Sequence, residues 1–462
     1  MNKTLERDID AFIERNRENI ISDIAELVAI PSVEGEPEDG APFGPGPKKA
    51  LLKGLEIADR LGLDTKNCGD RMGVAEISGQ SGEKYIATIT HLDVVPAGDG
   101  WSADPFTMRR RDGYIIGRGV MDDKGPSVLC LYALKYFREK GVALRYTMRA
   151  LLGTAEETGM GDVEWFLENC QAPAFAFSPD ADFPVVNGEK GILQGRLKAK
   201  AKLENIVSIS GGFVRNAVPD KAEAVIKTDE AKLAPAENIS VSYENGLAHI
   251  TARGVAGHAS HPEGTVNAIG VLVDYILASG AAGDGEEKFL RLVQKLLSSS
   301  DGSGVGVQAA DDVFTPLTII GGMAGTEDGY MWQTFDCRYP TTTDGETIVS
   351  KLLAAADGCC EAQIVSDAKP FYVDANAPAI RACVNSYNDV TGENKKPFTI
   401  GGGTYARDFP FAVSFGPEHD DRPFPEFAGG IHSVDEAANV DYFMEALKIY
   451  ILAMIKLQDT DF

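Results

Sequence analysis

This chain of 462 residues has fewer basic than acidic side chains. Lys and Arg number 44 against 69 Asp and Glu, which gives a formal net charge of -25. A field of that sign repels polyanions, so we expect neither nucleic acid nor an anionic lipid surface as a partner. The same field would favour a site that concentrates cations.

Long apolar runs and paired cysteines are missing as well. No stretch approaches the ~20 apolar residues that span a bilayer, and residues 1–33 lack the apolar core and cleavage site of a signal peptide. The seven cysteines are scattered, without a CxxC pair, which predicts reduced, mostly buried thiols. We therefore expect a cytoplasmic protein with no membrane partner.

Helical and strand patterns alternate along residues 1–190. Apolar residues recur at helical spacing up to Pro31, with a break expected near Asn16. Strand patterns such as KYIATITHLDVV then alternate with helical patterns such as KGPSVLCLYALKYFREKG. This alternation predicts an α/β domain with a mixed, largely parallel sheet and helices on both faces.

The pattern changes near residue 191. Alternating segments such as KAEAVIKT and ISVSYENGLAHITARG predict antiparallel strands, so we expect an inserted α+β domain over 191–372. Residues 373–462 return to helix, glycine-rich turn, strand and helix, and would complete the first domain. Two domains also fit the length, which is too great for a single core.

Acids and a histidine follow the predicted strands of the first domain. His91 and Asp93 follow one strand, Glu156 and Glu157 a second, and Asp180 a third. Ligands of an open α/β sheet collect beyond the carboxyl ends of its strands. Asp93 would face the same side as His91 on an extended chain, so its carboxylate could accept the second imidazole N–H and orient the ring.

Each signal also has a plain structural interpretation. A single histidine is more often a hydrogen-bonded structural residue, adjacent acids can be solvated, and the aspartates of SPDADFP can cap a turn. Together with the acid pair Asp122 and Asp123 in GVMDDKGP, however, these groups supply the oxygen and nitrogen ligands of a two-metal hydrolytic site.

Five motifs resemble those of the M20 family of metallopeptidases in order and spacing: THLDVVPAGDGW, GRGVMDDKGP, GTAEETGM, SPDADFP and GIHSVDE. With APFGPGPKKAL, GGGTYARDFP and the large insert, the chain is most similar to the PepV and Sapep type of bacterial dipeptidases. The resemblance implies a zinc-exopeptidase-like catalytic domain with an inserted lid and two divalent metal ions, zinc or alternatively manganese. The implied substrate is a small peptide with free termini.

The resemblance also implies roles for individual residues. His91 and Asp180 would hold one metal ion, and Glu157 and His432 would hold the other. Asp122 would bridge the two ions. Glu156 would be the general base, and Asp93 the partner of His91. The peptide bond between Asp122 and Asp123 would be cis.

Substrate contacts are implied for the insert and the glycine-rich turn. His258 would stabilise the oxyanion of the tetrahedral intermediate, whereas the motif does not select His261. The other implied contacts, to the substrate backbone and carboxylate, are Asn216, Arg338, Gly402, Gly403 and Arg407. A structural ion pair is the alternative role for Arg338.

Other functions stay open at this point. An amidohydrolase of the same family acting on N-acyl amino acids is the nearest alternative, and a non-catalytic binding protein on the same fold is a more remote one. We expect a monomer, because the insert would carry both halves of the substrate clamp. The residues SVDE follow His432 where relatives often have proline and asparagine before the glutamate, so the surroundings of this ligand would differ.

Overall fold

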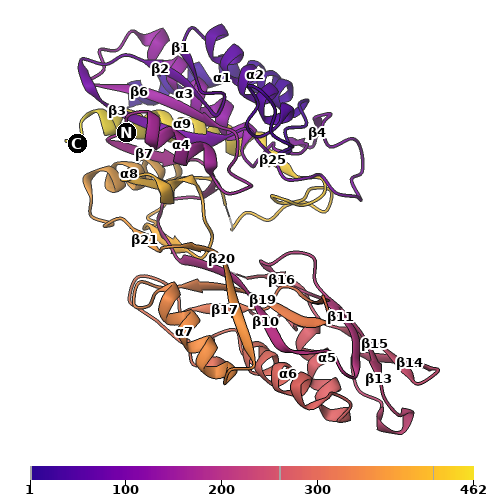
Figure 1. Cartoon of the computed structure of the whole chain (residues 1–462). Coiled ribbons are helices and arrows are strands. Elements are labelled where there is room, and N and C mark those ends of the chain that lie inside the picture. Colours follow the sequence, from indigo (N-terminus) through magenta and orange to yellow (C-terminus); the bar gives the residue numbers. More distant parts are fainter. Residues whose placement is uncertain (1–2, 260–261, 420) are drawn as a thin grey trace. The chain divides into compact units, whose positions relative to one another are not determined.

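The structure, a computed structural model, describes residues 3–259, 262–419 and 421–462, apart from the side chains of Glu83 and His258 (Figure 1). His261 therefore lies outside the described residues. The chain forms two compact units. Unit 1 comprises the chain up to Gly188 together with Tyr372–Phe398 and Thr404–Phe462, and unit 2 comprises Glu189–Phe371 and Thr399–Gly403.

Unit 1 is built on a sheet with the strand order β1-β2-β6-β3-β7-β23-β9-β21, and β22 pairs with β9. Neighbours from β6 through β3 and β7 to β23 are parallel, whereas β1–β2, β2–β6 and β23–β9 are antiparallel. The expected mixed sheet is thus parallel at its centre. Its strands are β1 (Asp64–Cys68), β2 (Met72–Ile77), β3 (Ser81–His91), β6 (Tyr146–Gly153), β7 (Phe175–Ser178), β9 (Val186–Glu189), β21 (Phe371–Tyr372), β22 (Phe398–Ile400) and β23 (Ala412–Ser414).

Smaller ladders complete unit 1: β4 (Arg109–Arg111), β5 (Tyr114–Ile116) and β25 (Ala437–Asn439) form one, and β8 (Ala181–Asp182) and β24 (Pro417–Glu418) form another. Its helices are α1 (Lys3–Val28), α2 (Pro45–Arg60), α3 (Lys124–Lys140), α4 (Gly161–Asn169), α8 (Pro378–Thr391), α9 (Val440–Gln458) and the 3-10 turn η3 (Tyr405–Asp408). Helices α1, α3 and α9 pack against one another.

Helices cover both faces of this sheet, as the alternation along β2 shows. A Cβ on Gly73 would contact Leu51 and Leu55 of α2. The next residue, Val74, lines a cavity together with Phe166 of α4. Because successive residues of a strand point to opposite faces, α2 and α4 lie on opposite faces, and the predicted fold class is confirmed.

The break expected in the first helix is absent, since α1 runs without interruption from Lys3 to Val28. Asn16 is buried, and its side-chain amide donates to the carbonyl of Phe12 one turn earlier at 2.8 Å. Lys135 of α3 donates to the amide oxygen of Asn16 at 2.8 Å. The prediction was wrong because these tertiary contacts satisfy a residue whose own helix propensity is poor.

Unit 2 is an antiparallel sheet with three helices. The strand order is β14-β15-β13-β11-β18-β19-β10-β20, with β17 beside β19. The burial of β13 alternates, and its buried residues belong to the same apolar cluster as residues of the helices, so one face of the sheet packs on them. This is the α+β pattern expected for the insert.

The strands of unit 2 are β10 (Gly191–Lys202), β11 (Ile206–Gly211), β12 (Ala217–Val218), β13 (Lys221–Lys227), β14 (Ile239–Glu244), β15 (Leu247–Arg253), β16 (Gly257–His258), β17 (Thr318–Ile320), β18 (Ala324–Glu327), β19 (Tyr330–Tyr339) and β20 (Cys360–Ala368). The helices are α5 (Ala268–Ser279), α6 (Asp284–Leu297) and α7 (Gly345–Ala356), with short 3-10 turns at Glu230–Lys232 and Ser303–Val305.

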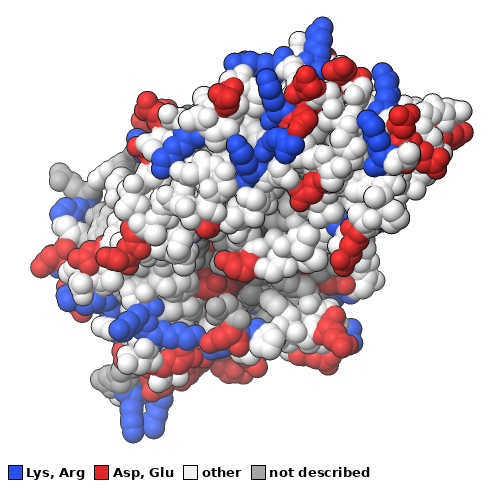
Figure 2. Space-filling model, turned by 90° about the horizontal axis from the view of Figure 1, so that it is seen from below, with Lys and Arg blue, Asp and Glu red and all other residues white. Residues whose placement is uncertain are grey.

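Charged surface residues, membrane-spanning segments and cysteines were the subject of expectations from the composition. The face shown in Figure 2 carries Lys and Arg interspersed with Asp and Glu. None of the helices within residues 3–259, 262–419 and 421–462 combines the length and apolar character needed to cross a bilayer. The seven cysteines are free thiols.

Candidate metal centre

The polar residues predicted for the site meet at one edge of the unit 1 sheet. Strands β6, β3 and β7 are parallel neighbours, so their carboxyl ends share that edge. His91 is the last residue of β3, Glu156 and Glu157 follow β6, and Asp180 follows β7. Asp122 lies in the turn just before α3.

The carboxylate of Asp122 lies between two imidazoles. Its Oδ1 is 2.8 Å from Nε2 of His91, and its Oδ2 is 2.9 Å from Nε2 of His432. Each oxygen therefore faces a different histidine. Nε2 of His432 is also 3.1 Å from Oε2 of Glu157, and Nε2 of His91 is 3.7 Å from Oδ2 of Asp180.

These side chains form two overlapping groups of potential metal ligands. One ligand atom each from His91, Asp122 and Glu157 lie within 4.8 Å of one another, and the same holds for His91, Glu156 and Asp180. Hard carboxylate oxygens together with imidazole nitrogen suit Zn²⁺ or Mn²⁺. The donor set fits two divalent ions that share the region around Asp122 and His91.

The electrostatics of the site are those of crowded buried acids. Burial raises the pKa of Glu156 and Asp180 well above the usual range, and negative neighbours, including Asp122 beside Asp180, add to the effect. Burial alone would lower the pKa of His432, but hydrogen bonds to Asp122 and Glu157 raise it to about 11. Positive charge is thus strongly favoured in this site.

A buried nitrogen gives the sharpest test of whether a cation fits. Oδ1 of Asp122 lies 2.8 Å from Nε2 of His91, yet among the described residues this fully buried nitrogen has no hydrogen-bond partner of suitable geometry. An unpaired buried polar atom is costly, and a metal ion would use both the nitrogen lone pair and the carboxylate. The residues present therefore fit the predicted metals.

Asp93 makes different contacts from the predicted one. Nδ1 of His91 makes its shorter contact with the main-chain carbonyl of Asp93, at 3.1 Å, while the nearest carboxylate oxygen is 3.5 Å away. The carboxylate of Asp93 instead accepts the backbone N–H groups of Glu156 at 3.2 Å and Glu157 at 3.1 Å. Asp93 orients the imidazole through its carbonyl and holds the acid pair through its side chain.

A second buried aspartate, which sequence reasoning missed, supports the same turn. Asp162 accepts the backbone N–H groups of Thr154 at 2.6 Å and Ala155 at 3.1 Å, and the hydroxyl of Tyr405 donates to it. The ring of Tyr405 also packs edge-on against His91, with 6.1 Å between centroids. Asp162 lies in the first turn of α4, where an acidic residue is common, and no motif sets it apart.

Glu436 is the other missed residue, and it supports Asp122. Its buried carboxylate accepts the backbone N–H groups of Gly119, Met121 and Asp122 at 3.0–3.2 Å. Arg118 donates to it at 2.6 Å. Because Glu436 follows His432 in GIHSVDE, it ties the loop of one candidate ligand to the turn of another.

Asp123 also has a defined place. Its Oδ2 accepts the backbone N–H of His91 at 3.2 Å, so it links the end of β3 to the turn before α3. The peptide bond between Asp122 and Asp123 is cis, as the resemblance implied.

Unit 2 contains most of the residues predicted to contact substrate. The backbone of His258 pairs with Ala217, and the carbonyl of Asn216 accepts the N–H of Ala259 at 2.9 Å. The hydroxyl of Thr318, a residue that β17 places opposite Arg338, donates to the carbonyl of Ala259 at 3.2 Å. The side chain of His258 lies outside the described residues.

Arg338 forms the ion pair that was the alternative to a substrate role. Its guanidinium binds both oxygens of Asp336, at 2.6 and 3.1 Å, and donates to the carbonyl of Gly401 at 2.9 Å. Arg338 therefore borders the turn that holds Gly402 and Gly403, both of which belong to unit 2. Arg407, in η3 of unit 1, is half-buried.

Known proteins resemble this chain over most of its length. Residues 87–456 match the family described as Peptidase family M20/M25/M40. A Bacillus subtilis (strain 168) protein named "Putative dipeptidase YtjP" is 32% identical over 464 residues, covering 96% of this chain and 98% of the relative. The "Beta-Ala-Xaa dipeptidase" of Lactobacillus delbrueckii subsp. lactis is 30% identical over 468 residues, covering 96% and 97%.

Solved structures share the fold. The crystal structure of human carnosine dipeptidase 1 aligns with a TM-score of 0.60 at 14% identity and covers 98% of this chain and 99% of the human chain. The chain belongs to peptidase family M20/M25/M40, which confirms the resemblance carried by its motifs. It is a hydrolase of a peptidase family whose members use divalent metals.

Proposed function

We propose that this member of peptidase family M20 is a dipeptidase that cleaves dipeptides with free amino and carboxyl termini and uses two divalent metal ions. The observation that carries the proposal is the carboxylate of Asp122, with one oxygen 2.8 Å from His91 and the other 2.9 Å from His432. Relatives over nearly the full length that are named dipeptidases support the choice of substrate.

We propose the division of ligands that the motifs predict. His91 and Asp180 would hold one ion, Glu157 and His432 the other, and Asp122 would bridge the two. Zinc is the expected metal and manganese the alternative, because imidazole and carboxylate ligands suit both. When bound, two such ions would polarise the scissile carbonyl and make a water acidic enough to ionise near neutral pH.

Glu156 is the proposed general base. It follows β6 beside Glu157, and Asp93 fixes its backbone. Its carboxylate lies beside His91 and Asp180, where it can take a proton from the attacking water and return it to the leaving amine. Asp93 acts as the residue that positions both Glu156 and His91.

Unit 2 is proposed to act as the lid that binds the rest of the substrate. His258 would stabilise the oxyanion. The residues proposed to bind the substrate backbone and carboxylate are Asn216, Arg338, Gly402, Gly403 and, from unit 1, Arg407. Since three N–H groups of Arg338 already bind Asp336 and Gly401, only its remaining donors are available for a carboxylate.

A monomeric, cytoplasmic enzyme completes the proposal. The lid and the metal centre belong to one chain, so a second copy need not supply either.

Side-by-side turnover of substrates tests this function. Purified protein loaded with Zn²⁺ or Mn²⁺ is assayed with Ala-X dipeptides, the same dipeptides N-acetylated, and N-acetyl amino acids. We expect hydrolysis of the free dipeptides only. Preference for N-acetyl amino acids would favour the alternative amidohydrolase, and activity that survives complete chelation would contradict the metal centre.

A further inference from the structure

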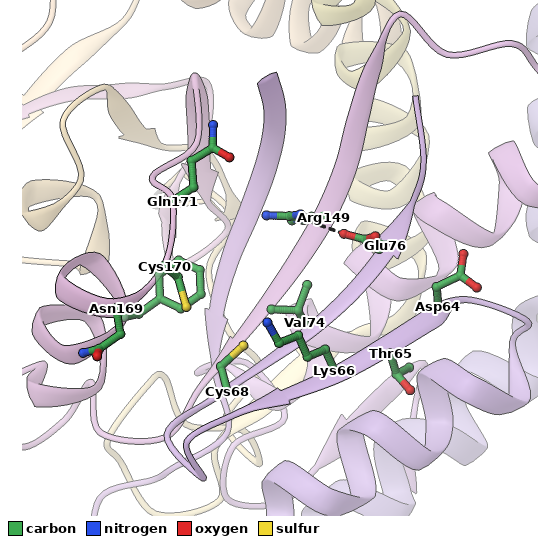
Figure 3. A pocket seen from close by; sticks show the side chains of 11 residues that line it. Asp64, Thr65, Lys66, Cys68, Val74, Glu76, Arg149, Asn169, Cys170 and Gln171 are labelled. Atoms are coloured by element: carbon green, nitrogen blue, oxygen red, sulfur yellow. Dashed lines mark hydrogen bonds and ion pairs between the residues drawn. The ribbon is translucent and has the colours of Figure 1, made fainter. Parts of the chain in front are cut away.

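A cavity of about 410 Å³ lies in unit 1, away from the metal centre (Figure 3). Strands β1, β2 and β6 form its floor, and α4 with the residues after it forms one side. Two cysteines line it, Cys68 at the end of β1 and Cys170 directly after α4. They are far apart in sequence, so the fold alone brings them to one cavity.

Packing between the β1–β2 turn and α4 fixes the two segments relative to each other. Gly69, which follows Cys68, has a φ of 63°, and a Cβ there would come within 2.4 Å of the Trp165 ring. The guanidinium of Arg71 lies 5.2 Å above the same ring. The turn that carries Cys68 is therefore held directly against the helix that leads to Cys170.

The two thiols differ in access. Cys68 is buried and Cys170 is half-buried, and Figure 3 shows the sulfur atoms of both at the cavity. Burial raises the pKa of the Cys68 thiol, and the neighbouring Cys170 raises it further. Cys170 is accordingly the thiol that a small oxidant reaches first.

We propose that Cys68 and Cys170 form an oxidisable dithiol, a modification site that takes a hydroperoxide as its oxidant and becomes a disulfide. The site is separate from the proposed dipeptidase chemistry and does not depend on it.

The reaction balances without any further reagent. The Cys170 thiolate attacks one oxygen of the hydroperoxide, the O–O bond breaks, and Cys170 becomes a sulfenic acid while water or an alcohol leaves. The Cys68 thiolate then attacks the sulfenic sulfur, the S–O bond breaks, and a second water leaves with the thiol proton. Two thiols are oxidised by two electrons as one peroxide is reduced.

The chain contains a matched pair that should not react in this way. Cys359 and Cys360 are neighbours in sequence, and Cys359 is half-buried like Cys170. Adjacent Cα atoms lie ~3.8 Å apart, below the ~4.4 Å at which ordinary disulfides begin. Oxidation of the folded protein should therefore select the cavity pair by geometry rather than by exposure alone.

Mass spectrometry of the folded, full-length protein tests the proposal. The protein is treated with a small excess of hydrogen peroxide, alkylated, and digested without reductant. We expect a cross-linked peptide pair containing Cys68 and Cys170, with Cys359 and Cys360 still alkylated, and a Tm several degrees higher because the disulfide restricts the unfolded chain.

Two single variants separate the steps. In Cys68→Ser, Cys170 should accumulate as a sulfenic acid that dimedone traps, whereas in Cys170→Ser the thiol at Cys68 should remain unmodified over the same period. The proposal is overturned if wild-type Cys170 is trapped by dimedone without forming the cross-link, or if Cys359 and Cys360 oxidise while the cavity pair stays reduced.

Discussion

Buried carboxylates are arranged differently in the two units. In unit 2, Glu286 accepts four backbone N–H groups, those of Gly283 and of the consecutive residues 204–206. In unit 1, Asp122, Glu157 and Asp180 face one another and two imidazoles. The first arrangement is satisfied by the protein alone, whereas the second leaves negative charges to be neutralised by something else.

Unit 1 contains both kinds, which makes the contrast instructive. Glu436 resembles Glu286, because it accepts three backbone N–H groups and an arginine, yet it lies next to the turn that carries Asp122. A buried acid surrounded by backbone donors stabilises local structure, and a buried acid surrounded by other acids indicates a cation site. Variants of matched residues in the two units can test this distinction.

Loss of the bridging charge should have the largest effect. Asp122→Asn should reduce bound metal from two ions per chain to one or none and lower turnover more than ~100-fold, beyond the range for loss of a residue that only supports a ligand. Metal content is measured by mass spectrometry after dialysis. Asp336→Asn, which removes a buried aspartate of unit 2, should keep both ions; an equal loss of metal there would contradict the assignment to unit 1.

Loss of the proposed base should leave the metals in place. Glu156→Gln keeps the size of the side chain and removes its ability to take a proton, so kcat should fall by roughly 10²–10⁴ with KM little changed. The metal content should equal that of the wild type. If both metals leave with the activity, Glu156 is a ligand rather than the base.

The two buried glutamates that accept backbone N–H groups, Glu436 and Glu286, give an intermediate effect. Glu436→Gln and Glu286→Gln each remove a charged acceptor from buried N–H groups and should each lower the free energy of unfolding by about 1–3 kcal/mol. Only Glu436→Gln should also weaken metal affinity, by roughly 10–100-fold, as measured by competition with a chelating dye. Equal metal affinity in both variants would limit Glu436 to a structural role.

The smallest effect concerns two histidines outside the metal centre. His419, in unit 1, packs among the rings of Phe183, Tyr387 and Tyr442. Burial lowers its pKa from 6.5 to about 4. His249, in unit 2, is exposed on β15.

The folded state binds His419's proton more weakly than the unfolded chain. Its contribution to stability is therefore complete above pH 6.5 and is lost as the pH falls to about 4. The free energy of unfolding of the wild type should fall as the pH is lowered from 6.5 to about 4. In His419→Phe this fall should be smaller by about 1–2 kcal/mol, a value that allows for the partial exposure of His419. Urea titrations at several pH values measure this, with the exposed His249→Gln as the control variant.

Local patterns in the sequence predicted much of the fold. The alternation of strands and helices was enough for the parallel centre of the unit 1 sheet, because βαβ units follow from local periodicity. The antiparallel pairing of β1 with β2, and of β2 with β6, was not predicted. The uninterrupted α1 also depended on tertiary contacts, those of Asn16 with Phe12 and Lys135.

The residues of the candidate site also differ in whether local sequence patterns could predict them. His91 and Asp180 could be predicted as candidate ligands because ligand chemistry restricts the residue type and an α/β fold places such residues at strand ends. Asp122 could be predicted because it belongs to an acid pair at a turn. Asp162 and Glu436 could not, because a carboxylate that binds backbone N–H groups needs no motif partner and can come from any segment that folds alongside. The carbonyl contact of Asp93 was missed for a similar reason, since main-chain atoms carry no residue signature.

Unit 1 is discontinuous in sequence, and this fixes the order in which its two parts are synthesised. The chain leaves unit 1 at Gly188 and returns at Tyr372, so almost all of unit 2 is translated between the two parts. At roughly 5–20 residues per second, His432 follows Asp180 from the ribosome by about 10–50 s. The first four proposed ligands are therefore synthesised while the centre of their sheet still lacks β23 and unit 2 is free to fold. Loading of the proposed metal centre would accordingly be one of the last steps in the maturation of the chain.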